Sequence, residues 1–149
     1  SSDPTNRAYA ERVARLIADL GLSDHVHWTG YASSEQVSAA LLATDLCVLP
    51  YRDGVSFRRG TLHACLAHGR AIVTTEPAIP LLEIEDGENM LLVKPGDPEA
   101  LARAAAEAAA DPELLAELQR GAAALAADFT WEQIVRQTET LFRKLPDAN

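Results

Sequence analysis

Residues 45–75, DLCVLPYRDGVSFRRGTLHACLAHGRAIVTT, contain two short apolar runs on either side of a predicted helix. The first run, LCVLP, is continuously apolar and ends at Pro50, which is typical of a parallel strand covered on both faces. The second run, AIVTT, predicts another short buried strand. From about residue 60 to 68, Leu62, Cys65 and Leu66 recur on one helical face. This order predicts two parallel strands joined by a helical crossover.

The segments on both sides continue the alternation. A helix is expected at 3–22 because apolar residues recur there every three or four positions, with Asp3 or Thr5 as its cap and Gly21 at its end. HVHWTG, residues 25–30, predicts a short strand. The other expected elements are a helix at 33–45, a strand at 90–93 and three helices that begin near 98, 112 and 131. The helices that begin near 98 and 112 each have an Asp cap and a Pro in the first turn.

The alternation predicts a single Rossmann-like domain over residues 1–149, an α/β fold with a parallel sheet and helices on both faces. We expect LCVLP to be the central strand, HVHWT to be its neighbour, and the last helix, from Trp131, to pack across the domain. Ligands of such sheets bind beyond the carboxyl ends of the strands, near helix N-termini. Residues 53–69, which follow LCVLP and open a helix, are therefore the predicted binding site.

Composition limits the kind of partner. The net charge of −9 repels nucleic acid and no dense run of Lys and Arg offsets it, so no nucleic-acid partner is expected. No apolar run approaches the ~20 residues that span a membrane, so no transmembrane segment is expected. Cys47 and Cys65 both occupy apolar positions and are predicted to lie in the core. Two buried thiols without a secretory signal indicate a reducing, cytoplasmic location.

Two arginines stand at the predicted start of the helix, in the sequence Arg58, Arg59, Gly60, Thr61. The helix dipole favours anions at this end and opposes cations. A bound anion explains this arrangement, because helix N–H groups and a guanidinium together form a bidentate phosphate site, and Gly60 lets a phosphate approach the backbone. The alternative is that both arginines are solvated surface residues paired with some of the many carboxylates.

The four histidines do not predict a metal site. His25 and His27 share one face of the expected strand, and His63 and His68 are five residues apart on the expected helix. No third ligand has a suitable spacing, so no metal is predicted. His68 is expected to cap the helix end rather than to act in catalysis, and no catalytic residue is assigned.

Four segments follow one another in the order LGLSDHVHWTGYASSEQVSAALLATDLCVLPYRDG, LAHGRAIVTTE, EIEDGENMLLVKPGDPEALARAAAEAAADPELLAELQRGAA and FTWEQI. Together they resemble the C-terminal lobe of family 4 GT-B-fold glycosyltransferases, and the resemblance runs from about residue 10 to 145. The resemblance implies a lobe that binds a nucleotide-sugar donor, such as a UDP-, GDP- or ADP-sugar, in an enzyme that retains the anomeric configuration and uses no metal or other cofactor.

The same resemblance implies a second, N-terminal lobe that holds the acceptor and is absent from this chain. It also implies that the first strand of the donor lobe is missing ahead of residue 1. Because transfer needs both substrates held together, the chain alone is expected to be inactive.

The chain departs from the family at two positions. The family has two glutamates eight residues apart, one contacting the donor sugar and the other the ribose. Counting back from Gly69, these positions hold Ser56 and Ala64, and Asp53 could stand in for the first. The family's loop at 29–33 lies against the nucleotide base, which suggests stacking by Tyr31, although a surface tyrosine that covers a helix end is an equal alternative.

Two other functions stay open. A degenerate lobe could bind a nucleotide sugar or a partner without catalysis, and the loss of both glutamates favours it. The third hypothesis is an unrelated Rossmann-like binding module. The segment from DGEN to PGDPEALA is evidence against it, because this segment carries part of the family resemblance. The predicted substrate-binding residues are Gly30, Tyr31, Asp53, Ser56, Arg58, Arg59, Gly60 and Thr61.

Overall fold

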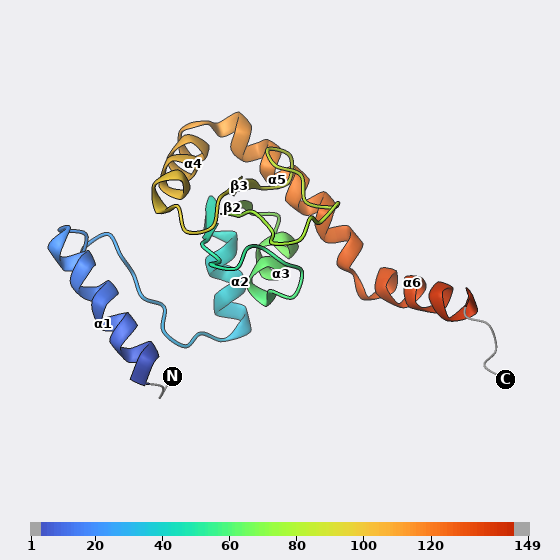
Figure 1. The fold of residues 1–149 in the computed structure, drawn as a ribbon, viewed down its shortest axis with the longest axis horizontal. Helices are drawn as coiled ribbons and strands as arrows, with labels where there is room; N and C mark the ends of the chain where they lie inside the picture. The colour runs from blue at the N-terminus through green and yellow to red at the C-terminus, as the bar shows by residue number, and fades with distance from the viewer. Residues whose placement is uncertain (1–3, 145–149) are drawn as a thin grey trace. The chain divides into compact units, whose positions relative to one another are not determined.

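The computed structural model describes the backbone of residues 4–144 and the side chains of residues 7–144. The chain divides into two compact units between Ser34 and Glu35 (Figure 1). The first unit begins with α1, Pro4–Asp19, which confirms the expected helix, and Gly21 follows it with a φ of 68°. The caps predicted at Asp3 and Thr5 fall outside the described side chains.

Residues 25–30 do not form the predicted strand. The chain turns here, and the backbone N–H groups of His25 and Val26 both donate to the carbonyl of Leu22, at 2.9 and 3.1 Å. A strand needs a partner that completes its backbone hydrogen bonds, and none of the described strands pairs with this segment. Trp28 is consequently exposed.

The second unit contains the remaining helices and strands, and their order agrees with the prediction. They are α2 (Ser34–Leu42), β1 (Leu46–Leu49), α3 (Gly60–Ala67), β2 (Ala71–Thr75), β3 (Leu91–Val93), α4 (Pro98–Ala110), α5 (Pro112–Ala126), the 3₁₀ turn η1 (Ala127–Phe129) and α6 (Trp131–Lys144).

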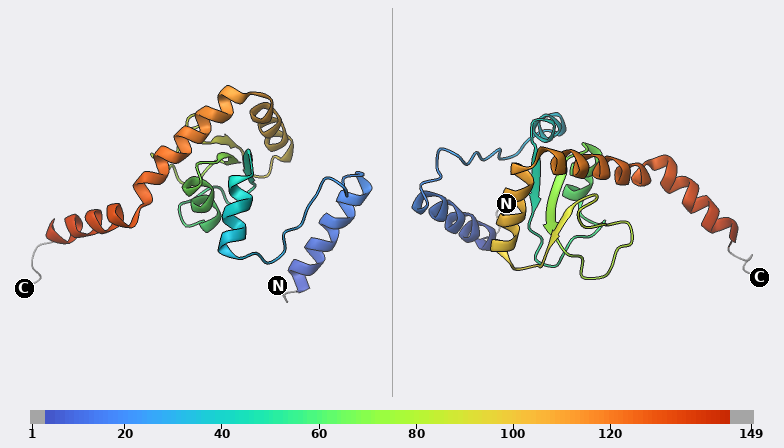
Figure 2. Two further views of the ribbon diagram at one scale, coloured as in Figure 1. Left: turned by 180° about the vertical axis from the view of Figure 1, so that it is seen from behind. Right: turned by 90° about the horizontal axis from the view of Figure 1, so that it is seen from above.

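The three strands form a parallel sheet in the order β1-β2-β3, with Leu46 opposite Ala71 and Val73 opposite Leu91. All five residues of β2 are buried, so both faces of this central strand are covered. Helix α4 contacts all three strands, and α5 contacts β2 and α3 (Figure 2). The predicted class, a Rossmann-like α/β fold with a parallel sheet, is confirmed.

The prediction that LCVLP is the central strand is wrong. Within the described sheet β1 lies at an edge and pairs only with β2. Its residue Val48 is 43% exposed, whereas β2 is buried throughout. The prediction fails because it assumes a neighbouring strand at 25–30, which does not form.

A buried apolar cluster lies where α3 and α5 meet the sheet. Ile72 of β2 packs there with Leu66 of α3 and Leu125 of α5. Cys47 and Cys65 belong to the same cluster, and both are free, buried thiols as predicted.

The predicted caps of α4 and α5 are confirmed. The Asp97 side chain accepts a hydrogen bond from the backbone N–H of Ala100 at 2.8 Å. Asp111 accepts from the N–H groups of Glu113 and Leu114, at 3.0 and 3.1 Å. Each cap satisfies N–H groups that a helix start otherwise leaves unpaired.

The last helix does not pack across the domain as predicted. The main contacts of α6 are with η1, and none of its residues is buried. Trp131, Val135 and Phe142 are exposed. Thr130, with a φ of −70° and a ψ of 148°, is extended and interrupts the helix, so α6 does not continue the line of α5. Within residues 4–144, no helix has both the length and the apolar character that crossing a membrane requires.

Candidate anion-binding site

Gly54 holds the loop after β1 against the end of β2. Its φ of 82° lies in the left-handed region, and a Cβ there would collide with the carbonyl oxygen of Glu76 and lie 2.9 Å from the backbone nitrogen of Ala78. The buried Val55 donates its backbone N–H to the carbonyl of Thr75 at 3.1 Å. These contacts keep the loop at the carboxyl edge of the sheet, where such folds bind ligands.

Arg59 has both a carboxylate and an aromatic ring as partners. Its guanidinium forms an ion pair with Asp53 and lies over the ring of Tyr51, with Cζ 4.8 Å from the ring centroid. The Tyr51 hydroxyl is 2.5 Å from Oγ1 of Thr61, in the first turn of α3. The Asp53 carboxylate therefore offsets the positive charge of Arg59, which the dipole of α3 disfavours at this end of the helix. Tyr51 is not among the predicted residues, although its position directly after Pro50 and β1 is a signal for it.

The start of α3 has no side-chain cap. Arg59 occupies the N-cap position, with a φ of −90° and a ψ of 107°, and makes no capping hydrogen bond. Because the first N–H groups of a helix have no partner within it, those of Gly60 and Thr61 are available beside the arginines. A Cβ added at Gly60 would meet nothing within 4 Å, so the backbone is open on that side. Free N–H groups next to guanidinium groups suit an anion.

A cavity of about 350 Å³ lies beside the loop that leads into α3. It brings together three predicted residues, Asp53, Ser56 and Arg58. The other residues that line it are Gly54, Val55, Phe57, Ala78, Ile79 and Leu81. The cavity thus combines an apolar wall with one carboxylate, one hydroxyl and one guanidinium.

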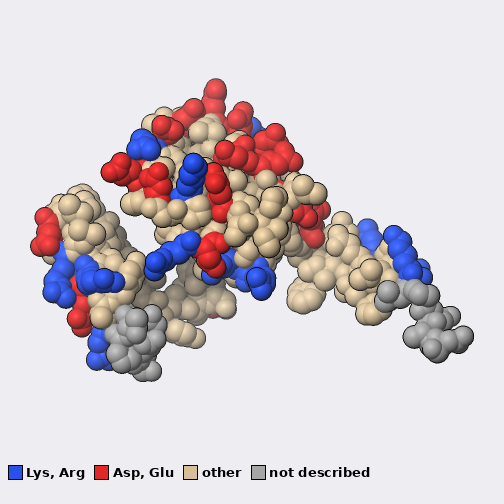
Figure 3. Space-filling model, in the orientation of Figure 1, with Lys and Arg blue, Asp and Glu red and all other residues tan. Residues whose placement is uncertain are grey.

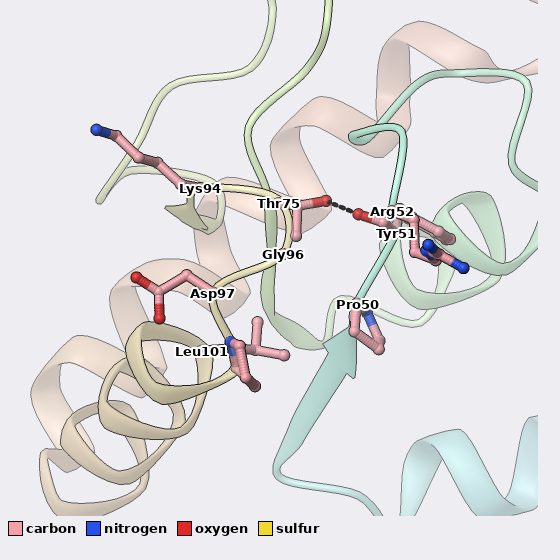
Figure 4. A pocket seen from close by; sticks show the side chains of 9 residues that line it. Pro50, Tyr51, Arg52, Thr75, Lys94, Gly96, Asp97 and Leu101 are labelled. Carbon is pink, nitrogen blue, oxygen red and sulfur yellow. Dashed lines mark hydrogen bonds between the residues drawn. The ribbon is translucent and has the colours of Figure 1, made fainter.

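A smaller cavity, of about 130 Å³, lies at the carboxyl ends of the strands (Figure 4). Pro50 and Leu101 give it an apolar lining, and the side chains of Arg52 and Lys94 extend in opposite directions from it. The hydroxyl of Thr75 donates to the carbonyl of Tyr51 at 2.8 Å and ties the ends of β1 and β2 together. The sequence prediction misses this cavity, although the positions directly after β1 and β3 could have indicated it. Its remaining lining residues are Gly96, Asp97 and Pro98.

Gly30 and Tyr31 belong to the first unit, whereas the site described above lies in the second. Gly30 has a φ of 61°, and Tyr31 is fully exposed. The assignment of Tyr31 to a base contact stays a prediction.

His68 caps the end of α3, as predicted. Its Nδ1 lies 2.7 Å from the carbonyl oxygen of Ala64, and its Nε2 lies 2.7 Å from the hydroxyl oxygen of Ser38. A carbonyl can only accept, so Nδ1 carries the proton, and in the neutral ring Nε2 accepts from the serine. Among the described residues, no three His, Cys, Asp or Glu side chains are placed to hold a metal ion.

Negative charge is unevenly distributed over the surface. In the view of Figure 3, acidic side chains gather over α4 and α5, which carry Glu99, Glu107, Glu113 and Glu117. Basic side chains form smaller groups on the same face. Because the net charge of −9 repels anions, an anion would depend on local positive charge such as that of Arg58 and Arg59.

Comparisons with known proteins identify relatives by sequence. The family model described as Glycosyl transferases group 1 matches residues 3–111. An exopolysaccharide phosphotransferase of Streptomyces coelicolor is 34% identical over 134 residues, which cover 90% of this chain and 14% of that protein. A D-inositol 3-phosphate glycosyltransferase of Streptomyces avermitilis is 29% identical over 143 residues, covering 95% of this chain and 30% of that protein. The chain spans less than a third of either relative.

Solved structures share the fold. Anabaena HepE in complex with UDP-glucose matches with a TM-score of 0.79 at 21% identity, covering 93% of this chain and 38% of that one. Sucrose-phosphate synthase from Thermosynechococcus elongatus matches with a TM-score of 0.79 at 26% identity, covering 97% of this chain and 36% of that one.

Proposed function

Because the chain belongs to the glycosyl transferases group 1 family, we propose that it is the donor-binding part of a glycosyltransferase. The donor in this proposal is a nucleotide diphosphate sugar with uridine, guanosine or adenosine, and the sugar is transferred with retention of the anomeric configuration. The acceptor lies on a second lobe outside this chain. The observation that carries the proposal is the uncapped start of α3 beside Arg58 and Arg59, within the residues that the family matches.

The diphosphate binds to the two arginines and to the N–H groups of Gly60 and Thr61. Each charge-assisted hydrogen bond contributes roughly 1.5–3 kcal/mol. Arg59 is oriented for this role by the Tyr51 ring below its guanidinium and by Asp53 at its edge.

The sugar of the donor lies toward Asp53 and Ser56, which line the larger cavity. Donor binding needs no metal or other cofactor in this proposal, because the arginines and helix N–H groups neutralise the diphosphate.

A non-catalytic lobe is the second candidate function. Ser56 and Ala64 carry no carboxylate where the family resemblance places two glutamates. The absence of both carboxylates favours a module that binds a nucleotide sugar or a partner without transferring a sugar.

Calorimetry with UDP, GDP and ADP tests the donor site. We expect Arg58→Ala and Arg59→Ala each to weaken binding of the preferred diphosphate about ten- to a hundredfold, the loss of one charge-assisted contact. Binding by the parent chain should also weaken as salt is added, since part of the site is exposed. Arg103→Ala is the matched control, because Arg103 is exposed on α4 and pairs only loosely with Glu99, at 3.9 Å.

Two outcomes would contradict the proposal. If both site variants bind nucleotide diphosphates as tightly as the parent, the arginines are surface charges and this loop is not a phosphate site. If Arg103→Ala weakens binding to the same extent, the effect reflects overall charge and not a site.

A further inference from the structure

Phe57, His63 and Phe129 form a cluster of three aromatic rings beside the arginines of the candidate site. Phe57 lies in the loop that leads into α3, directly before Arg58, while His63 lies in α3 and Phe129 in η1. The ring centroids of Phe57 and Phe129 are 4.5 Å apart, and His63 meets Phe129 edge-on at 5.0 Å. The cluster holds the loop against the turn that follows α5.

His63 also binds the backbone of this loop. Its Nε2 lies 2.7 Å from the carbonyl oxygen of Phe57. A carbonyl can only accept, so Nε2 carries the proton and is the donor. The Phe57 carbonyl and the N–H of Arg58 belong to one planar peptide unit. The hydrogen bond therefore fixes the orientation of the peptide at which Arg58 begins.

Arg58 depends on its backbone more than Arg59 does. The Arg59 guanidinium has the Asp53 carboxylate and the Tyr51 ring as partners. Arg58 is exposed, and among residues 7–144 neither an ion pair nor an aromatic ring holds its guanidinium. The direction of the Arg58 side chain is consequently set by the loop, and His63 fixes the loop one peptide before it.

We propose that His63 is a positioning residue for the diphosphate and that it acts through Arg58. The inference rests on the proposed function, in which Arg58 binds the diphosphate of the donor. Without the hydrogen bond from His63, the peptide before Arg58 takes several orientations, and the guanidinium faces the diphosphate in only a fraction of them. The apparent Kd rises as that fraction falls. Because one neutral hydrogen bond changes an equilibrium constant by a factor of about two to ten, a rise of this size is expected.

Two variants separate the hydrogen bond of His63 from the packing of its ring. His63→Phe keeps an aromatic ring beside Phe129 but has no donor, whereas His63→Gln has no ring but keeps an N–H donor at a similar reach. In calorimetry of the whole chain with UDP, GDP and ADP, we expect His63→Phe to raise the Kd of the preferred diphosphate about two- to tenfold. His63→Gln should bind almost as tightly as the parent. The proposal is overturned if His63→Phe binds like the parent, or if His63→Gln loses as much affinity as His63→Phe.

A double-mutant cycle tests whether His63 acts through Arg58. In an Arg58→Ala chain, His63→Phe should cause no further loss of affinity, because the side chain that His63 positions is gone. An equal loss with and without Arg58 would show that His63 supports the fold in general, and the proposal would fail. Circular dichroism shows whether each variant is folded, and His63→Leu, which also lacks a donor, replaces His63→Phe if that variant is not.

Failure of this inference and failure of the proposed function give different results. If the parent chain binds a diphosphate, Arg58→Ala weakens that binding and His63→Phe does not, only the role of His63 is wrong. If the parent chain binds no diphosphate, or Arg58→Ala binds it like the parent, Arg58 is not part of a phosphate site and the role of His63 is overturned with it.

Discussion

Arg59 has an anionic partner within its own chain, the carboxylate of Asp53. The sequence raises the question of why two arginines stand where a helix dipole repels cations, and the structure gives part of the answer as an ion pair with Asp53. The guanidinium has five N–H donors, so one carboxylate leaves donors for a phosphate. The carboxylate would also repel that phosphate, because both are negative.

Asp53→Asn is therefore expected to tighten the binding of a nucleotide diphosphate. The amide keeps an oxygen that accepts from Arg59 but removes the repelling charge, and for a largely exposed group this gain is small, roughly a factor of three to ten in Kd. Calorimetry with UDP measures the change. Glu99→Gln on α4, which removes an exposed carboxylate from the looser pair with Arg103, should leave Kd unchanged. Weaker binding by Asp53→Asn would show that the orientation of Arg59 by the charged carboxylate outweighs the repulsion between that carboxylate and the phosphate.

Gly54→Ala is expected to destabilise the fold. The new Cβ would collide with the carbonyl of Glu76, and the backbone would stay at a φ of 82°. We expect a loss of about 3–4 kcal/mol in the free energy of unfolding, measured with urea. Gly87→Ala is the matched control, since its φ is 81° but nothing lies within 4 Å of its Cβ. That variant should lose only about 1–2 kcal/mol, and equal losses would show that the contact with Glu76 is unimportant.

At the scale of elements, capping residues nearby in the sequence determine where the helices begin, whereas close contacts with other segments determine where the helices lie. Asp97 and Asp111 cap their own helices within three residues of the sequence. In contrast, α5 approaches the backbone at Glu88 and Asn89 so closely that only a glycine, Gly121, fits. This contact joins α5 to the turn before β3.

Gly121→Ala tests that contact. Alanine favours a helix over glycine by about 1 kcal/mol, but the new Cβ would overlap the carbonyl of Glu88 and lie 2.8 Å from the Cα of Asn89. We expect the overlap to dominate, with a net loss of about 1–3 kcal/mol in urea unfolding. Gly60→Ala, at the other described helical glycine, has open space around its Cβ and should change the stability by less than about 0.5 kcal/mol. A more stable Gly121→Ala variant would show that α5 can shift at no cost.

At the scale of the whole molecule, the chain accounts for only part of the proteins to which it is similar. It covers 14% and 30% of the two curated relatives and 38% and 36% of the two solved structures. The apolar side chains of α6 and those of Tyr9, Leu16 and Leu20 in or next to α1 are exposed. Both amphipathic patterns correctly predict a helix, whereas the predicted packing of α6 across the domain is wrong.

We expect the chain by itself to give no glycosyl transfer. Holding donor and acceptor together can supply roughly 7–11 kcal/mol of the barrier reduction, and in the proposed function the acceptor lies on another lobe. Incubation with a panel of nucleotide sugars and acceptors, followed by mass spectrometry of the products, measures transfer. Robust turnover would show that acceptor binding resides within these residues.

Much of the site follows from the sequence because its parts are close along the chain. The arginines, Gly60 and Thr61 are adjacent, and the strand–loop–helix order places them at the carboxyl edge of the sheet. The partnership of Arg59 with Asp53 and Tyr51 could not be read in this way, because many carboxylates were possible partners. The smaller cavity, which joins residues after β1 and β3, was missed for a similar reason: it exists only once the sheet has formed.

The sequence by itself determined the helices, their Asp caps and the parallel strand–helix–strand unit at 45–75, because periodicity and capping act between residues a few positions apart. Only the tertiary structure decided which strands pair, that β2 rather than β1 is central, that 25–30 stays irregular and that α6 remains uncovered. The physical reason is that a strand or an apolar face is completed by a distant partner, so its state depends on whether that partner's backbone or surface is in place.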